Sequence, residues 1–221
     1  MHIEPGIVAG AKIALSHATA AAAGAVTLKL ASDGLRERGL PSLALRSALT
    51  TALVLAFFEV LPHHPVGVSE VHLILGSTLF LLFGAAPAAI GLALGLLVQG
   101  LVFAPLDLPQ YGMNVTTLLV PLFAVSALAR RIIAPGTAYV DLHYGQALAL
   151  SAAYQGGVVA WVAFWAIYGQ GVAGIDGVAS FGLAYMLVVL IEPLVDLAVL
   201  AGAKSLRGLR GSGLVTPRLF A

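Results

Sequence analysis

The first residues of the chain could chelate a metal ion. A free amine at Met1, the amide nitrogen of His2 and the imidazole of His2 can reach one ion together and close small chelate rings. One further imidazole would complete four nitrogens, which suits Ni(II) or Cu(II) in a square plane, and Co(II) also accepts imidazole nitrogen. These groups must lose protons to bind, so we expect the affinity to collapse in mild acid. From the dipeptide alone, an accidental histidine on a frayed end is the simpler interpretation.

Other candidates are polar residues in or beside long apolar runs, where each is costly unless it is paired or hydrated. His72 follows the loop Pro65–Val71, and a lone histidine at a helix start usually caps or packs. Gln99 and Asn114 can hydrogen-bond across helices or orient a ligating imidazole. The remaining candidates are Glu59, Glu70, Glu192, Asp196, His17 and the loop residues His63 and His64.

Glu192 and Asp196 are four residues apart, so they share one face of the last predicted helix. They could form a proton or ion relay. A polar seam, or a contact with a partner subunit, fits residues so near the predicted cytoplasmic end better.

Enzyme motifs are missing from the sequence. There is no phosphate-binding Gly-x-x-x-x-Gly-Lys-Ser/Thr, no His-Glu-x-x-His, and no plausible nucleophile constellation on one membrane face. The chain has no cysteine, so disulfides, zinc–thiolate sites and iron–sulfur clusters are excluded. We expect no catalytic residues, no nucleic-acid partner, and an ATP site on another chain if ATP drives the protein.

Composition predicts the elements that must position these residues. Of 221 residues, 60% are hydrophobic and 10% are charged, against about 25% charged in an ordinary soluble domain. A membrane span needs about 20 mostly apolar residues. We therefore predict an all-α, polytopic membrane protein, one transmembrane domain over residues 1–221, with about seven helices. They are expected at 7–31, 44–62, 70–84, 86–105, 113–129, 143–169 and 178–202. The third and fourth are short, which leaves a tilted or partly re-entrant pair open.

Charge predicts the orientation. With the N-terminus outside, the cytoplasmic loops would be 32–45, 84–87, 130–142 and 203–221. These loops or their edges hold ten of the eleven basic residues, all but Lys12, as the positive-inside rule requires. The ten are Lys29, Arg36, Arg38, Arg46, Arg130, Arg131, Lys204, Arg207, Arg210 and Arg218. The first residues lack the basic stretch of a signal peptide, so we expect Met1 to be the mature N-terminus.

Four motifs, in order, resemble one family. The start Met1–Gly6 is similar to the Met-His-Ile opening of the CbiM/NikM-type substrate-capture membrane subunits of cobalt and nickel energy-coupling-factor (ECF) transporters. Pro65–His72 resembles the family's Ser-rich loop that ends in histidine. Leu82–Gly84 with Leu96–Leu101 resembles its Leu-Phe-Gly and Gln-Ala-Leu motifs, and Gly112–Val115 its Gly-Ala-Asn-Val. The motifs cover residues 1–130, and the rest matches in hydropathy alone.

The resemblance implies a metal site and a transport role. Family members bind Co(II) or Ni(II) through groups that correspond here to Met1, His2 and His72, with Asn114 supporting and Gln99 structural. It further implies seven helices and an N-terminal segment, residues 1–6, inserted into the protein. The expected setting is a multi-pass protein of the bacterial inner (plasma) membrane that serves cobalamin biosynthesis. Its partners would be lipid, a transmembrane coupling subunit and ABC ATPase subunits, and the need for a small accessory membrane subunit stays open.

The motifs also depart from the family pattern. Pro5 stands where an acidic residue is usual, and Leu73 resembles nickel members, whereas the loop Leu106–Gln110 is closer to cobalt members. We lean to cobalt. A stand-alone secondary divalent-metal transporter remains the alternative, although such proteins usually carry inverted repeats and none is visible here. A membrane enzyme would need a nucleophile or redox centre that the sequence does not offer.

Overall fold

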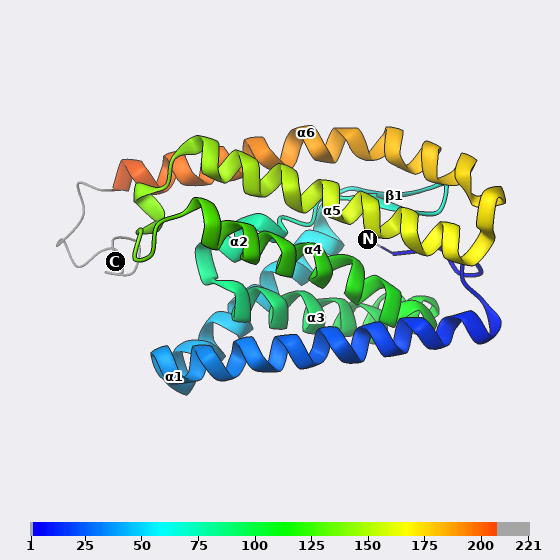
Figure 1. The fold of residues 1–221 in the computed structure, drawn as a ribbon, viewed down its shortest axis with the longest axis horizontal. Helices are drawn as coiled ribbons and strands as arrows, with labels where there is room; N and C mark the ends of the chain where they lie inside the picture. Colours follow the sequence, from blue (N-terminus) through cyan, green and yellow to red (C-terminus); the bar gives the residue numbers. More distant parts are fainter. Residues whose placement is uncertain (1, 207–221) are drawn as a thin grey trace.

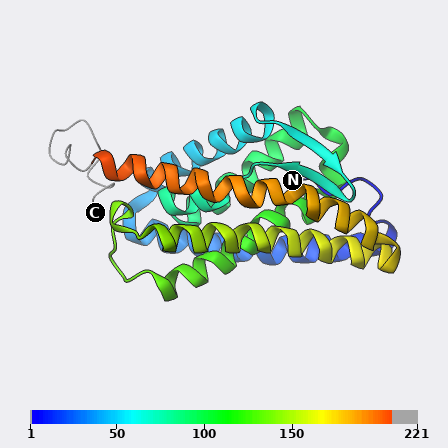
Figure 2. The same ribbon diagram turned by 90° about the horizontal axis from the view of Figure 1, so that it is seen from above.

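The computed structural model describes residues 2–206. Long helices run side by side along the long axis of the molecule, with a small β-hairpin among them (Figures 1 and 2). The helices are α1 (Ile13–Val60), α2 (Gly76–Phe83), α3 (Ala85–Val102), α4 (Tyr111–Ile132), α5 (Tyr144–Gln170) and α6 (Ile175–Ser205). The antiparallel strands are β1 (His63–Val66) and β2 (Ser69–His72). Short 3-10 helices lie at Gly10–Lys12, Pro105–Gln110, Tyr139–Asp141 and Gly171–Gly174.

The helices have the length and composition of membrane spans. Four continuous helical stretches within residues 2–206 are long and apolar enough to cross a bilayer: Gly10–Val60, Ala85–Val102, Pro105–Ile132 and Tyr144–Ser205. The first and the last are long enough for two crossings each, and they turn at Gly39 and near Gly171. The prediction of a mainly α-helical, polytopic membrane protein is confirmed.

The loop predicted between the first two helices is much shorter in the structure than expected. Residues 32–43, expected as a loop, are helical except at Gly39, whose φ of 77° and ψ of 167° interrupt α1. Glycine adopts a positive φ at little cost. Pro41 lacks an amide hydrogen, and the first turn of a helix does not need one there. One glycine is therefore enough to reverse the chain, and Asp33 and Gly34 stay within the first helical part.

The predicted helix 70–84 is also wrong in its first half. Residues 69–72 form β2, residues 73–75 are irregular, and only Gly76–Phe83 is helical. Those eight residues span about 12 Å, so α2 cannot cross a bilayer of about 30 Å alone. The extended residues before α2 lengthen this passage, and they stay extended because β1 and the N-terminal segment take up their backbone hydrogen bonds.

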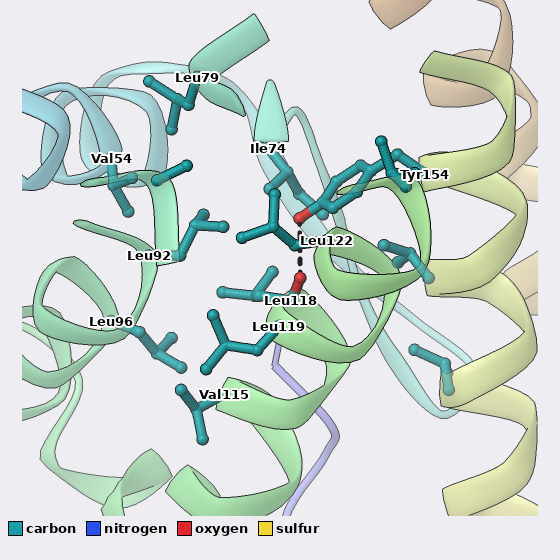
Figure 3. Packing of buried hydrophobic residues seen from close by; sticks show 14 of the residues in the cluster. Val54, Ile74, Leu79, Leu92, Leu96, Val115, Leu118, Leu119, Leu122 and Tyr154 are labelled. Atoms are coloured by element: carbon teal, nitrogen blue, oxygen red, sulfur yellow. Dashed lines mark hydrogen bonds between the residues drawn. The ribbon is translucent and has the colours of Figure 1, made fainter. Parts of the chain in front are cut away.

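Small residues let the helices pack closely around one apolar core. A Cβ added to Gly91 or Gly95 of α3 would lie 2.3 Å from Thr50 and 2.5 Å from Val54 of α1. This Gly-x-x-x-Gly spacing allows close backbone approach, which drives helix association in lipid. Buried aliphatic side chains of α1, α3 and α4 meet beside this contact, and Tyr154 of α5 closes the cluster with a hydrogen bond from its hydroxyl to the Leu118 carbonyl (3.3 Å; Figure 3).

Connections gather at the two ends of the molecule. Residues 33–41, the connection between α2 and α3, and residues 133–143 lie toward one end, whereas the hairpin tip, residues 103–110 and residues 171–174 lie toward the other (Figure 1). The first end carries basic residues of the predicted cytoplasmic loops. Of that charge pattern, Arg207, Arg210 and Arg218 lie outside the described residues.

Candidate metal site

The N-terminal segment is inserted into the protein as an additional strand beside β2. The Glu70 amide donates to the His2 carbonyl (2.9 Å), and the Glu4 amide donates to the Val68 carbonyl (3.1 Å). The Ser69 hydroxyl also donates to the His2 carbonyl (2.9 Å). These bonds satisfy backbone groups that would be costly to bury unpaired, and they hold His2 with only 5% of its surface exposed.

Asn114 and an apolar cluster hold the next residue. The Ile3 amide donates to Asn114 Oδ1 (2.8 Å), from the first turn of α4. The Ile3 side chain is 1% exposed and packs with Val8, Met113 and Trp165. Asn114 thus contacts the N-terminal segment directly, next to the predicted ligand His2.

The ring of His2 has one nitrogen engaged by an amide. His2 Nε2 lies 2.9 Å from Gln99 Oε1, and Gln99 Nε2 donates to Glu59 Oε1 (2.9 Å). Because the Glu59 carboxylate accepts, the Gln99 amide turns its nitrogen to Glu59 and its oxygen to His2. That oxygen needs a donor, so Nε2 carries a proton and donates to it. A carboxylate–amide–imidazole chain of this kind orients a ligating ring.

Carboxylates face the other nitrogen of His2. Nδ1 lies 2.7 Å from Asp107 Oδ2 and 3.3 Å from Glu70 Oε2. Burial raises the pKa of the nearby Glu4, the charges of Glu70 and Asp107 raise it further, and His2 opposes the shift. Two carboxylates directed at one point concentrate negative charge there, which favours a cation at that point. We call His2, Glu59, Glu70, Gln99 and Asp107 the His2 cluster.

His72 lies next to His2. The two ring centroids are 6.2 Å apart, and the Phe58 ring contacts both. His72 is 3% exposed, and its Nδ1 donates to the Leu73 carbonyl (3.2 Å), which leaves Nε2 with a lone pair. An imidazole nitrogen binds a first-row metal at about 2.0–2.1 Å, so rings with centroids up to roughly 6 Å apart can share one ion. The two histidines are near the limit of that range.

The predicted site residues are thus brought together in part. His2, His72, Asn114 and Gln99 converge, whereas Met1 lies outside the described residues. Among residues 2–206 there is no group of three or more His, Cys, Asp or Glu side chains that could hold a metal ion. The predicted ligand set therefore depends on the amine and amide nitrogens of the chain start. His63 pairs with His72 in the hairpin register but is exposed, and His17 is exposed on α1.

Sequence reasoning missed the contact of His2 with Asp107. Asp107 was not singled out, although it lies in the polar stretch after α3, whereas Gln99 had been considered both as a structural residue and as one that orients an imidazole, and it contacts the His2 ring. No spacing rule connects residue 2 with residues 99 and 107. A polar residue beside an apolar run was the available signal, and it marked Gln99 and Glu59 without assigning their partners.

The two carboxylates of α6 do not face a partner subunit. Glu192 and Asp196 are 0% and 1% exposed and bond within the chain, which corrects that expectation. Glu192 accepts from the amides of Ile74 and Leu75 and from the Gln155 side chain. Asp196 accepts from two hydroxyls of α2, those of Ser77 and Thr78. We call Ser77, Thr78, Gln155, Glu192 and Asp196 the α6 cluster.

Comparison with known proteins agrees with this arrangement. A family model described as the cobalt uptake substrate-specific transmembrane region matches residues 2–208. The chain belongs to this family. The match extends through α5 and α6, beyond the part of the chain that carried recognisable motifs, and it confirms the resemblance to CbiM/NikM-type proteins.

Solved structures share the fold. A crystal structure of a transition metal transporter has a TM-score of 0.71 and 16% identity, over 97% of this chain and 98% of that chain. A truncated transition metal transporter has a TM-score of 0.68 and 17% identity, over 91% of this chain and 97% of that chain. No curated protein matches the sequence.

Proposed function

We propose that this chain is the substrate-specific membrane component of an ECF transporter, which captures Co(II), or Ni(II), outside the cell for ATP-driven uptake. The ion would be held by the amine of Met1, the amide nitrogen and Nδ1 of His2, and Nε2 of His72. The carboxylates of Glu70 and Asp107 would attract the cation to this point. Asn114 would fix the N-terminal segment, and Gln99 the ring of His2.

One observation carries this proposal. In a member of a cobalt uptake family, the N-terminal segment docks beside β2 so that His2 lies buried next to His72, 6.2 Å between ring centroids. A frayed end with an accidental histidine would have no reason to bury that side chain among hydrogen bonds. The nitrogen set also supports selectivity, because alkaline-earth ions prefer oxygen ligands.

The identity of the metal is proposed as cobalt first. The family model that matches the chain is described by cobalt uptake. Four nitrogens in a plane would also suit Ni(II), so nickel is the second candidate. The metal is cargo in this proposal, and the chain itself needs no catalytic residue.

The remaining machinery is proposed to lie on other chains. A transmembrane coupling subunit and ABC ATPase subunits would drive transport. The complex could also include a small accessory membrane subunit. The setting would be the bacterial inner (plasma) membrane, with the N-terminus outside. Arg36, Arg38, Arg130 and Arg131 would then face the cytoplasm, where the coupling partners act.

The test is metal retention by the purified chain with its authentic Met1. It is compared with a copy extended by one residue before Met1, which turns the terminal amine into an amide, and with His72→Ala. One bound Co(II) or Ni(II) in the first protein, lost from both variants, supports the proposal and identifies the metal. Equal binding by the extended copy would refute the N-terminal chelate and with it the main reason for assigning metal uptake.

A further inference from the structure

The segment that carries His72 continues into an irregular junction. After β2, residues 73–75 lead into α2, and Leu75 adopts a left-handed conformation (φ 55°, ψ 31°). For a residue other than glycine this conformation is sterically unfavourable. The amides of Ile74 and Leu75 lie between β2 and α2, so neither the strand pairing nor the helix supplies their acceptors. The junction therefore needs acceptors from elsewhere in the protein.

Glu192 of α6 supplies those acceptors. One of its carboxylate oxygens accepts from the amides of both Ile74 and Leu75, the latter at 2.9 Å. The other oxygen accepts from Gln155 Nε2, and Gln155 Oε1 in turn accepts from the Tyr185 hydroxyl (2.7 Å). Glu192, Gln155 and Tyr185 are each 0% exposed. This carboxylate therefore fixes the junction that precedes α2, and it comes from a different helix.

The partners of Glu192 argue against a relay site for cations. Two of them are backbone amides, which can only donate, and the third is an amide nitrogen turned toward the carboxylate by Tyr185. A cation at this carboxylate would have to displace these donors and leave two buried amides unpaired, which is costly. Glu192 thus holds the junction rather than an ion.

The junction begins at the residue after His72. The carbonyl of Leu73 accepts from His72 Nδ1 (3.2 Å), and the next two amides are those bonded to Glu192. We propose that Glu192 is a positioning residue for His72: it fixes residues 73–75 and, through them, the direction of the imidazole that meets His2. The capture site is thereby coupled to α6. This inference rests on the proposed function, because an effect of Glu192 on metal binding requires that His72 binds the ion.

The experiment exchanges the side chains of the buried, hydrogen-bonded pair Glu192 and Gln155. Glu192→Gln presents an amide to Gln155, so two amide nitrogens oppose each other unless Gln155 turns over and gives up the hydrogen bond that it accepts from the Tyr185 hydroxyl. The double variant Glu192→Gln with Gln155→Glu restores a donor and an acceptor, because the new carboxylate at position 155 can accept both from the new amide at position 192 and from the Tyr185 hydroxyl. Asp176→Asn is the matched control, since Asp176 is an exposed carboxylate on the same helix. Co(II) and Ni(II) affinity and amide hydrogen exchange of residues 73–83 are measured on monodisperse protein.

The expected result is at least tenfold weaker metal binding and faster exchange at Ile74 and Leu75 in Glu192→Gln. Most of both effects should be recovered in the double variant, and Asp176→Asn should change neither. Unchanged affinity and exchange in Glu192→Gln would overturn the inference, as would a folded double variant that recovers neither. If the unaltered chain binds no metal, the proposed function fails, and the exchange data still test whether Glu192 holds the junction.

Discussion

The His2 cluster and the α6 cluster are both polar, both lie against the segment 69–78, and yet they are satisfied in opposite ways. Around His2, the carboxylates of Glu70 and Asp107 both face Nδ1. Around Glu192, the two backbone amides and the Gln155 side chain all donate. An excess of acceptors creates a place for a cation, whereas a balanced set of donors and acceptors stabilises the fold.

The comparison gives a rule for interpreting carboxylates at membrane depth. A buried carboxylate in a transporter is by default a candidate for the transport path. Here the more deeply buried Glu192 and Asp196 accept hydrogen bonds from amides and hydroxyls. The less buried Glu70 and Asp107 face His2, the candidate ligand. The partner atoms of a carboxylate, and not its depth, separate the two roles.

The largest expected effect comes from removing an imidazole of the site. His72→Ala should weaken Co(II) or Ni(II) binding by about a hundredfold or more, because a four-nitrogen set loses one ligand. His63→Ala is the control, since His63 lies opposite His72 in the hairpin but is exposed, and it should bind within about twofold of the unaltered chain. Isothermal titration measures both. A larger loss in His63→Ala would move the site to the hairpin loop.

Truncating the α6 cluster should reduce stability rather than affinity. Asp196→Ala leaves the hydroxyls of Ser77 and Thr78 without their acceptor, and we expect a loss of about 2–4 kcal/mol in the free energy of unfolding. Metal affinity per folded chain should stay within about threefold, since Asp196 does not bond to residues 73–75. Unfolding in detergent with Asp176→Asn alongside measures the first quantity. Loss of metal binding at unchanged stability would assign Asp196 to the transport path.

Breaking the Glu59–Gln99–His2 hydrogen bonds should reduce the metal affinity moderately. Gln99→Leu leaves His2 Nε2 and Glu59 without their shared partner, and removal of such an orienting group typically costs about 10–100-fold in metal affinity. Gln110→Leu is a matched control, because the buried Gln110 Oε1 has no hydrogen-bond partner among the described residues. Competition with a metallochromic indicator gives both affinities. Equal affinities for the two variants would make Gln99 structural, as the sequence suggested.

The smallest effect is expected from a single charge. Asp107→Asn keeps the shape of the side chain but removes one negative charge 2.7 Å from His2 Nδ1. The affinity should fall by a few-fold, and the association rate should fall more at low than at high ionic strength because salt screens exposed charges. Asp33→Asn, at the opposite end of the molecule, should leave the stopped-flow rates unchanged. A salt-independent effect of Asp107→Asn would indicate direct ligation.

The sequence predicted the helices well where hydropathy decides and poorly where long-range pairing decides. The expected ranges for α3 to α6 lie within a few residues of the observed ends. Residues 70–72 were expected to begin a helix, but they form a strand because β1 and residues 2–4 pair with this part of the chain, and a short apolar run does not distinguish the two forms. Gly39 shows the converse, since one positive φ replaced an expected loop.

The candidate site was predictable only in its ligands. Residue type marked His2, and similarity to family motifs marked His72 and Asn114, which do lie together. The Glu59–Gln99–His2 chain and the contact with Asp107 join residues from separate helices and a connecting loop. Their geometry depends on packing that no local pattern encodes.

The docking of the N-terminal segment also sets an order of assembly. The partners of residues 2 and 3 lie 67, 97 and 111 positions later in the chain, at Ser69, Gln99 and Asn114. Residues 2 and 3 therefore cannot complete their contacts until α4 has begun to form. A nascent chain that stops before Asn114 would lack the acceptor of the Ile3 amide, so residues 2 and 3 are among the last parts to reach their final position.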